Sequence, residues 1–316
     1  MLFNSLEFMI FFPVVCLIYY VIPHRVRYIF LLVCSYFFYM CWNPTYALLM
    51  LTSTAITYVS GLLLSSAEKI ADEGVRSRRK KWYVALSFAS NLSILFFFKY
   101  FNFAADTVVR LLQAVHIQAQ APTFDVILPV GISFYTFQAL SYTVDVYRND
   151  IYAEKNFLKY ALFVSFFPQL IAGPICTYKE LVPQFEDFSK KVINNENIRR
   201  GLFFITIGLL KKVLLADNFT DFIQDVIKQE AMTEFYTTWI FAFSIAMQGY
   251  FDFSGYCDIA IGLGSLFNIE LPINFDSPYK SKDISDYWRR WHITMGRFLK
   301  YHVYIPMGGS RRGEIR

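Results

Sequence analysis

Long apolar runs separated by short polar connectors make up most of this chain, and they predict a bundle of helices inside a membrane. A helix of about 20 apolar residues is long enough to cross the hydrocarbon core of a bilayer. We expect spans at residues 5–22, 28–42, 45–65, 82–98, 126–147, 157–175, 201–216 and 235–268. The predicted fold class is therefore an all-α integral membrane protein, a multi-span helical bundle in one transmembrane domain over residues 1–316.

One of these runs, residues 157–175, is interrupted by Pro168, Gly173 and Pro174. Proline removes a backbone donor and breaks a helix, so this run predicts a broken or re-entrant helix instead of a clean span. Irregular backbone at membrane depth persists only where protein or a water-filled cavity satisfies its amides. A cavity near Gln169 follows as a hypothesis.

Residues 283–300 show a different pattern, with apolar residues at helical spacing on one side and basic residues on the other. The apolar side holds Phe298, Trp291, Met295, Trp288, Leu299 and His292, and the basic side holds Arg289, Arg290, Arg297 and Lys300. This pattern predicts one interfacial amphipathic helix, with Asp283 or Ser285 as its N-cap. His292 stands at the edge of the apolar side beside Gly296. Its imidazole either packs as a semi-buried residue or faces a cavity, and the spacing alone favours packing.

Composition excludes an ordinary soluble domain, because 55% of the residues are hydrophobic, 19% are aromatic and the mean hydropathy is +0.35. The five cysteines form no C-x-x-C pair and the four histidines lack close ligand spacing, so neither a disulfide framework nor a metal site is predicted. The net charge of +5 comes from basic residues gathered in short loops. Such loops report membrane topology, and we expect no binding of nucleic acid.

The basic loops also give an orientation, since positively charged loops stay on the cytoplasmic side. Residues 67–82 hold the densest positive charge and residues 23–27 carry two arginines, so we place both loops in the cytoplasm and the N-terminus outside. The long polar segment 177–200 falls on the cytoplasmic side as well. Lys211 and Lys212 interrupt an apolar run, and we expect them to snorkel to an interface.

Among the polar side chains inside the apolar runs, where contact with lipid is costly, five are candidates for a site. They are Gln138, Asp145, Gln169, Asp252 and Asp258. We interpret them as groups that line a cavity or support a site. For Asp145, a structural pairing with a nearby Arg or Tyr is an equal alternative. Asp252 and Asp258 lie about 120° apart on an ideal helix, so they are poorly placed as a shared acid and base pair.

Four separate blocks of the sequence carry motifs, and they occur in a fixed order. The blocks are PVGISFYTFQALSYTVDVYR (129–148), FFPQLIAGPI (166–175), YFDFSGYCDIAIGLG (250–264) and WRRWHITMGRFLKYHVYIPMGGSR (288–311). Together they resemble the membrane-bound O-acyltransferase family, in the branch that contains alginate O-acetyltransferases and the D-alanyl transferase of teichoic acid synthesis.

The resemblance implies transfer of an acyl group from a thioester donor, acetyl-CoA or an acyl carrier, to a hydroxyl, without a bound cofactor. It implies the bacterial cytoplasmic (inner) membrane as the location. The expected partners are the lipid bilayer, the acyl donor and extracellular polysaccharide-acetylation proteins.

By its place in the last block, His292 matches the first of two histidines associated with the family's active site. The reaction needs a base for the hydroxyl proton, and histidine is the side chain best suited to that task near neutral pH. Trp288, Arg289, Arg290 and Trp291 adjoin it in the motif and are further candidates for the site.

The last block also departs from the family pattern. Family members carry a second histidine downstream of the GG turn, which would lie beyond Arg316, and Tyr301 and His302 replace the usual residues. We therefore expect a C-terminally truncated chain whose 316 residues alone are inactive. Donor-dependent acylation in liposomes tests this expectation.

The leading hypothesis is an O-acetyltransferase for an exported, alginate-like polysaccharide. D-alanyl transfer from a carrier protein to teichoic acid stays open within the same family. Broken helices and intramembrane carboxylates also suit a secondary transporter, although FFPQLIAGPI has no second copy. A non-catalytic scaffold for an extracellular transferase is a further alternative. Replacing His292 by Ala in a full-length protein separates the enzyme from both of these.

Overall fold

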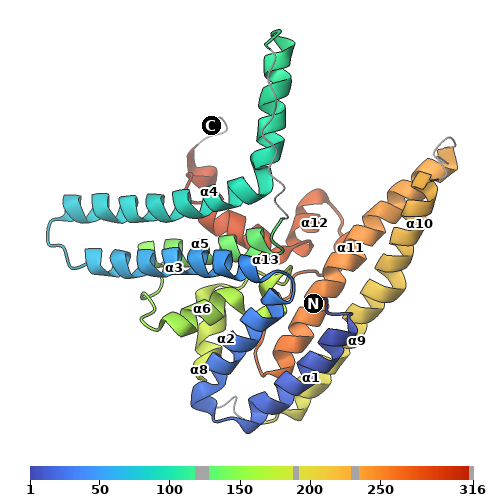
Figure 1. Ribbon diagram of the computed structural model, residues 1–316, viewed down its shortest axis with the longest axis horizontal. Helices are drawn as coiled ribbons and strands as arrows, with labels where there is room; N and C mark the ends of the chain where they lie inside the picture. The colour runs from blue at the N-terminus through green and yellow to red at the C-terminus, as the bar shows by residue number, and fades with distance from the viewer. Residues whose placement is uncertain (118–127, 188–191, 229–234, 313–316) are drawn as a thin grey trace. The chain divides into compact units, whose positions relative to one another are not determined.

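The computed structural model describes residues 1–117, 128–187, 192–228 and 235–312, and every regular element in these ranges is a helix (Figure 1). The chain divides into two compact units. One unit holds Met1–Trp42 together with Phe166–Arg316, and the other holds Asn43–Ser165. The predicted all-α class is confirmed for the described residues.

The unit Asn43–Ser165 contains α3 (Pro44–Ala67), α4 (Glu73–Ala114), α5 (Ile132–Tyr147) and α6 (Phe157–Ser165). Helices α3, α4 and α5 pack against one another (Figure 1). Buried polar side chains bond across the packed faces, as where Tyr160 donates to the hydroxyl of Thr57 at 2.7 Å. Among the described residues, α3 and α4 are the two helices that are long and apolar enough to cross a membrane.

The other unit contains the elements from both ends of the chain. They are α1 (Leu6–Val21), α2 (His24–Met40), α7 (Phe167–Leu170), α8 (Tyr178–Glu186), α9 (Asn195–Leu209), the π-helix η2 (Leu210–Ala216), α10 (Asp217–Lys228), α11 (Phe235–Leu266), the 3-10 turn η3 (Pro278–Lys280), α12 (Ile284–Arg290), α13 (Ile293–Leu299), the π-turn η4 (Lys300–Tyr304) and the 3-10 turn η5 (Gly309–Arg312). Helix α9 continues through η2 into α10, and this long rod packs along α11 (Figure 1).

Glycines allow α9 and α11 to approach closely. A Cβ atom placed on Gly208 would lie 2.6 Å from the carbonyl oxygen of Gly255, and one on Gly262 would lie 2.6 Å from that of Gly201. Real Cβ atoms do not come so near to backbone oxygens. Small residues at such contacts are how helices pack tightly in membranes, where no hydrophobic effect drives them together.

Phe167, the first residue of the short helix α7, anchors the broken segment in an aromatic core. Its ring lies within 6.4 Å, centroid to centroid, of the rings of Phe8, Phe12, Phe38 and Phe267. The backbone N–H of Phe167 donates to Ser35 Oγ at 3.1 Å, so the start of α7 is satisfied inside the protein. The broken segment therefore has a defined position within its unit.

Each run that the sequence predicts as a span contains a helix in the described residues; positions 126 and 127 lie outside them. The break in the run 157–175 is confirmed, because α6 ends at Ser165, α7 ends at Leu170 and no helix follows until Tyr178. That the other helices cross the bilayer, and that the broken one re-enters it, stay predictions.

The prediction of a loop over residues 67–82 was wrong in its second half. Helix α4 begins at Glu73, after Asp72 accepts a hydrogen bond from the N–H of Val75 at 2.8 Å as the N-cap. Arginine and lysine are strong helix formers, so the basic stretch forms the first turns of α4 instead of a loop.

Candidate functional site

The predicted helix 283–300 is broken in its middle, and this correction locates the candidate site. Helix α12 ends at Arg290, Trp291 is extended, and α13 begins at Ile293. Between the two helices His292 has φ 45° and ψ 53°, a left-handed conformation that costs a non-glycine residue roughly 1–2 kcal/mol.

The break forms because the connector after α11, residues 269–276, supplies backbone hydrogen bonds at this point. The N–H of Ile293 donates to the carbonyl of Asn274 at 2.9 Å, and the N–H of Asp276 donates to the carbonyl of Arg290 at 3.0 Å. Each such bond is worth about 1 kcal/mol net, so together they offset the cost of the left-handed residue.

The side chain of Asn274 is at the centre of the site. Its Oδ1 accepts hydrogen bonds from the backbone N–H of Thr294 at 3.1 Å and from the Thr294 hydroxyl at 2.9 Å, and Nδ1 of His292 lies 3.1 Å from the same oxygen. Its Nδ2 donates to Cys257 Sγ at 3.3 Å. Asn274 is only 1% exposed, so water does not compete for these contacts.

These contacts decide which nitrogen of His292 carries the proton. The backbone N–H of Thr294 can only donate, so the amide atom of Asn274 that faces it must be the oxygen. That oxygen has no proton to give, and Nδ1 of His292 must therefore be the donor. In the neutral ring the lone pair then lies on Nε2, which is the nitrogen that can take a proton.

The imidazole of His292 is half-buried beside two aromatic rings. The Phe253 ring lies 4.8 Å away, centroid to centroid and nearly perpendicular at 85°, and the Phe275 ring lies 6.3 Å away. Burial lowers the pKa of His292 to about 4, because the charged ring loses its hydration. The ring is therefore neutral near pH 7, the state that a general base needs.

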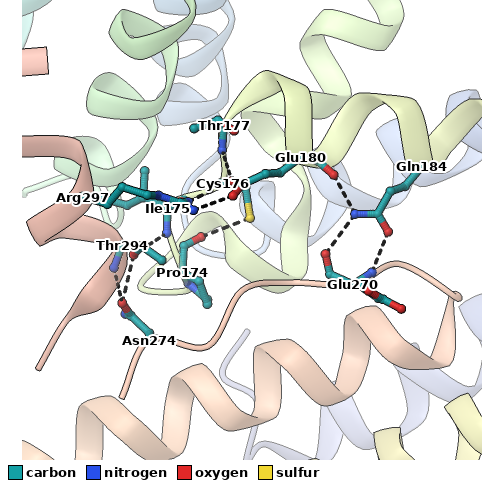
Figure 2. A network of polar contacts seen from close by, with 10 residues as sticks. All are labelled: Pro174, Ile175, Cys176, Thr177, Glu180, Gln184, Glu270, Asn274, Thr294 and Arg297. Atoms are coloured by element: carbon teal, nitrogen blue, oxygen red, sulfur yellow. Dashed lines mark hydrogen bonds and ion pairs between the residues drawn. The ribbon is translucent and has the colours of Figure 1, made fainter. Parts of the chain in front are cut away.

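Helix α8 contacts both segments that hold His292, the connector 269–276 and helix α13 (Figure 2). Arg297 of α13 reaches both carboxylate oxygens of Glu180, at 2.5 and 2.9 Å. One turn further along α8, Gln184 accepts a hydrogen bond from the N–H of Glu270 at 2.8 Å and donates one to its carbonyl at 3.0 Å. The connector and α13, which together hold His292, are thus fixed to the same helix.

The two carboxylates of α11 have lysine partners. Asp258 Oδ2 lies 2.6 Å from Nζ of Lys211, and Asp252 Oδ1 lies 2.8 Å from Nζ of Lys212. Lys212 also lies 2.8 Å from Asp217. The apolar run around Lys211 and Lys212 predicted that both lysines snorkel to an interface, and it gave no sign of these pairs. A role for the two aspartates in lining a cavity stays a prediction.

The remaining polar candidates lie in different places. Gln138 and Asp145 are buried in the unit Asn43–Ser165, where Gln138 donates to the carbonyl of Phe163 at 2.7 Å. Gln169 is buried in α7, and its carbonyl accepts from the N–H of Gly173 at 2.9 Å. Their roles as site residues stay predictions.

The motif residues next to His292 have unequal environments. Trp288 and Arg289 are exposed, whereas Arg290 binds Asp286 at 3.0 Å and Asp276 at 3.4 Å. Trp291 packs into an aromatic cluster formed by Tyr250, Phe275, Tyr279 and Tyr287. Of the four, Trp291 and Arg290 have contacts that hold the break in place.

Sequence reasoning missed several residues of the site, which are Glu180, Phe253, Asn274, Phe275 and Thr294, and it gave Arg297 only a place on the basic side. Asn274 sits in an irregular connector, where hydrophobic periodicity carries no information. The available signal was a single asparagine in the short apolar stretch 271–275, 14 residues before the histidine motif begins at Trp288.

Two clefts elsewhere do not include His292. One of about 370 Å³ is lined by residues of η2, α10 and α11, and one of about 350 Å³ lies in the unit Asn43–Ser165. A cavity at the imidazole stays a prediction. Among the described residues, no three His, Cys, Asp or Glu side chains are grouped so that they hold a metal ion.

Comparison with known proteins identifies the family of this chain. The sequence model of a protein family, MBOAT, the membrane-bound O-acyltransferase family, matches residues 18–315. The chain is 40% identical, over 91% of its length, to the peptidoglycan O-acetyltransferase of Helicobacter pylori, and 37% identical, over 98%, to the probable alginate O-acetylase AlgI of Pseudomonas aeruginosa. It spans 57% and 58% of those two proteins. It is 27% identical, over 60% of its length, to the teichoic acid D-alanyltransferase of Bacillus subtilis, of which it spans 48%.

Proposed function

This chain belongs to the membrane-bound O-acyltransferase family, and from that membership and the site geometry we propose that the complete protein is a membrane acyltransferase that uses His292 as its general base. The acyl group comes from a thioester donor, acetyl-CoA or an acyl carrier. The acceptor is a hydroxyl of an exported polysaccharide of the alginate-like class. The observation that carries the proposal is the contact of His292 Nδ1 with Asn274 Oδ1, which leaves the lone pair on Nε2.

The reaction needs one proton to move between two substrates. Nε2 of His292 takes the proton of the acceptor hydroxyl while the hydroxyl oxygen forms a bond to the carbonyl carbon of the donor. The bond between that carbon and sulfur breaks, and the departing thiolate receives the proton from Nε2. The imidazole of His292 is thus neutral again after the transfer. Atoms and charges balance in this step without a metal or a redox partner.

Acetyl is the proposed acyl group because the relatives that share 33 to 40% identity with this chain are named for O-acetylation. D-alanyl transfer is the second candidate, supported by relatives that share 25 and 27% identity over 56 and 60% of the chain. The two differ in the donor, which an assay with radiolabelled acetyl-CoA and with D-alanyl carrier protein separates.

The proposed setting is the bacterial cytoplasmic membrane, with the N-terminus outside and the donor on the cytoplasmic side. Extracellular polysaccharide-acetylation proteins would then receive the acyl group or complete its transfer. The basic segments 23–27 and 67–82 support this orientation, since positive charge near the ends of spans favours the cytoplasmic side.

The test is the replacement His292→Asn in the complete protein. Asparagine tolerates the left-handed backbone but offers no base, so we expect acyl transfer to fall by about 10²-fold or more. His116→Asn is the matched control, because His116 also has a left-handed backbone, at φ 61°, and is exposed in the other unit. Undiminished acylation by His292→Asn would overturn the proposal in favour of a transporter or scaffold.

A further inference from the structure

Asn274 connects three parts of the unit that are far apart in the sequence. Through Oδ1 it bonds to Thr294, whose hydroxyl accepts from the N–H of Ile175 at 3.0 Å (Figure 2). Through Nδ2 it bonds to Cys257, whose thiol donates to the carbonyl of Ala172 at 3.6 Å. The turn after α7 is therefore tied to Asn274 on both sides.

We infer that Asn274 is a positioning residue for His292, whose amide fixes the imidazole in the tautomer that presents Nε2 to the substrate. This inference rests on the proposed function. It assigns a role to a residue outside all four motif blocks, and it makes the base depend on the turn at residues 172–175.

A 180° flip of the Asn274 side-chain amide would break hydrogen bonds that the observed orientation makes. A flipped amide would set its NH2 group against the N–H of Thr294, donor against donor, and would take the donor away from Cys257. A buried polar group left without its partner costs about 1–3 kcal/mol. The orientation of the oxygen, and with it the proton on Nδ1 of His292, is therefore set by the fold and needs no adjustment during the reaction.

Asn274, whose amide oxygen contacts Nδ1 of His292, is a neutral partner. Three carboxylates on the elements around the site have basic partners: Asp258 of α11 with Lys211, Asp276 of the connector with Arg290, and Glu180 of α8 with Arg297. The thiol of Cys257, which contacts the Asn274 amide, is another ionisable group, and it donates to a backbone carbonyl. Asn274 thus holds the ring through an acceptor that carries no negative charge.

Two substitutions in the complete protein separate positioning from packing. Asn274→Asp keeps an acceptor for Nδ1 and for Thr294 but places a negative charge on the ring, which favours the imidazolium form. We expect near wild-type kcat at pH 8, with the acidic limb of the pH profile moved upward by about one pH unit or more. Asn274→Leu has a similar volume and no acceptor, and we expect kcat to fall by about 10²-fold with KM changed far less.

Asn91 provides the matched control. It is also 1% exposed, and its amide also accepts from a hydroxyl, that of Ser53, and donates to a carbonyl, that of Ser87, but it lies on α4 in the other unit. Asn91→Asp and Asn91→Leu therefore reproduce the loss of a buried amide. We expect them to lower the melting temperature and to leave kcat per folded protein and the pH profile unchanged.

His292→Asn, measured in parallel, separates the two hypotheses. If it abolishes transfer while Asn274→Asp keeps the wild-type pH profile, the inference about Asn274 is wrong and the proposed function stands. A wild-type kcat for Asn274→Leu would likewise contradict the inference about Asn274 and leave the proposed function standing. If His292→Asn remains active, the proposed function itself fails. Should Asn274→Leu not insert into the membrane, the pH profile of Asn274→Asp decides alone.

Discussion

The guanidinium of Arg297 donates two hydrogen bonds to the carboxylate of Glu180, from Nη1 to Oε1 at 2.5 Å and from Nη2 to Oε2 at 2.9 Å (Figure 2). Glu180 also closes a capping box with Thr177 at the start of α8. The carboxylate therefore serves two purposes, since it caps the N-terminus of one helix and holds the helix that follows His292. A forked arginine matches this geometry and a lysine does not.

Arg297→Lys is predicted to loosen α13. The substitution keeps the charge but removes one of the two contacts with Glu180. Both side chains are about a third exposed, so water screens the pair, and we expect a loss of only about 0.5–1 kcal/mol in the free energy of unfolding. Thermal unfolding of the complete protein in detergent micelles measures it. Arg289→Lys, at an exposed position of α12, is the control, and equal stability of the two variants would contradict the prediction.

The pH dependence of the reaction is predicted to reflect the burial of His292. Because burial lowers the pKa of this ring to about 4, the base stays neutral well below pH 6.5. We expect kcat/KM of the complete protein to hold between pH 7 and 5 and to fall only near pH 4. An acidic limb centred at pH 6.5 would show instead that the ring is as hydrated as a free histidine.

The lowered pKa of His292 also makes the stability of the fold depend on pH. Because the folded protein favours the neutral ring, the free energy of unfolding decreases as the pH falls. The contribution of His292 to the free energy of unfolding is fully present above the pKa of a histidine in the unfolded chain, about 6.5. It is lost as the pH falls from there toward 4, the pKa of His292 in the folded protein. Wild-type protein should therefore lose more stability than His292→Asn between pH 6.5 and 4. Parallel melting curves for the two proteins would contradict this.

The pair of Lys211 and Asp258 is predicted to be strongly coupled. The two side chains are 24% and 17% exposed, so removing either partner leaves a largely buried charge. We expect Asp258→Ala to cost about 1–3 kcal/mol, with Lys211→Ala adding little to it in the double variant. The exposed pair of Arg199 and Glu196 on α9 is the control, for which the same cycle should give near zero. Additive losses at Lys211 and Asp258 would refute the coupling.

The close approach of α9 to α11 is predicted to depend on Gly208. An added methyl group would lie 2.6 Å from both the carbonyl oxygen of Gly255 and Cγ1 of Ile259, so Gly208→Ala should destabilise by about 1–3 kcal/mol. Gly249→Ala is the control on α11, because its added methyl group has no neighbour within 4 Å. That control should be neutral or stabilising, through better helix propensity. Equal melting temperatures for the two variants would contradict the packing argument.

The sequence by itself determined that the described residues form helices and where most of them lie. Apolar runs such as 45–65 are recognised because helix formation depends on nearby residues, whose spacing the sequence displays directly. The prolines of the run 157–175 also indicated an interruption, and Pro168 lies in the first turn of α7, directly after the break at Phe166, where a proline is tolerated because its missing N–H needs no partner. The motif around His292 likewise pointed to the family that the comparison confirms.

Only the tertiary structure decided that the helix at 283–300 breaks at His292 and that Asn274 holds the ring. The amphipathic pattern across the break is intact, so nothing local forbids a continuous helix. The bonds that break it come from a connector about 20 residues earlier. The Thr294 hydroxyl that Asn274 binds is in turn held by the N–H of Ile175, which lies 119 residues from Thr294 along the chain. A hydrogen bond between distant residues leaves no periodic trace in a sequence, because its energy depends on where the fold brings its two atoms.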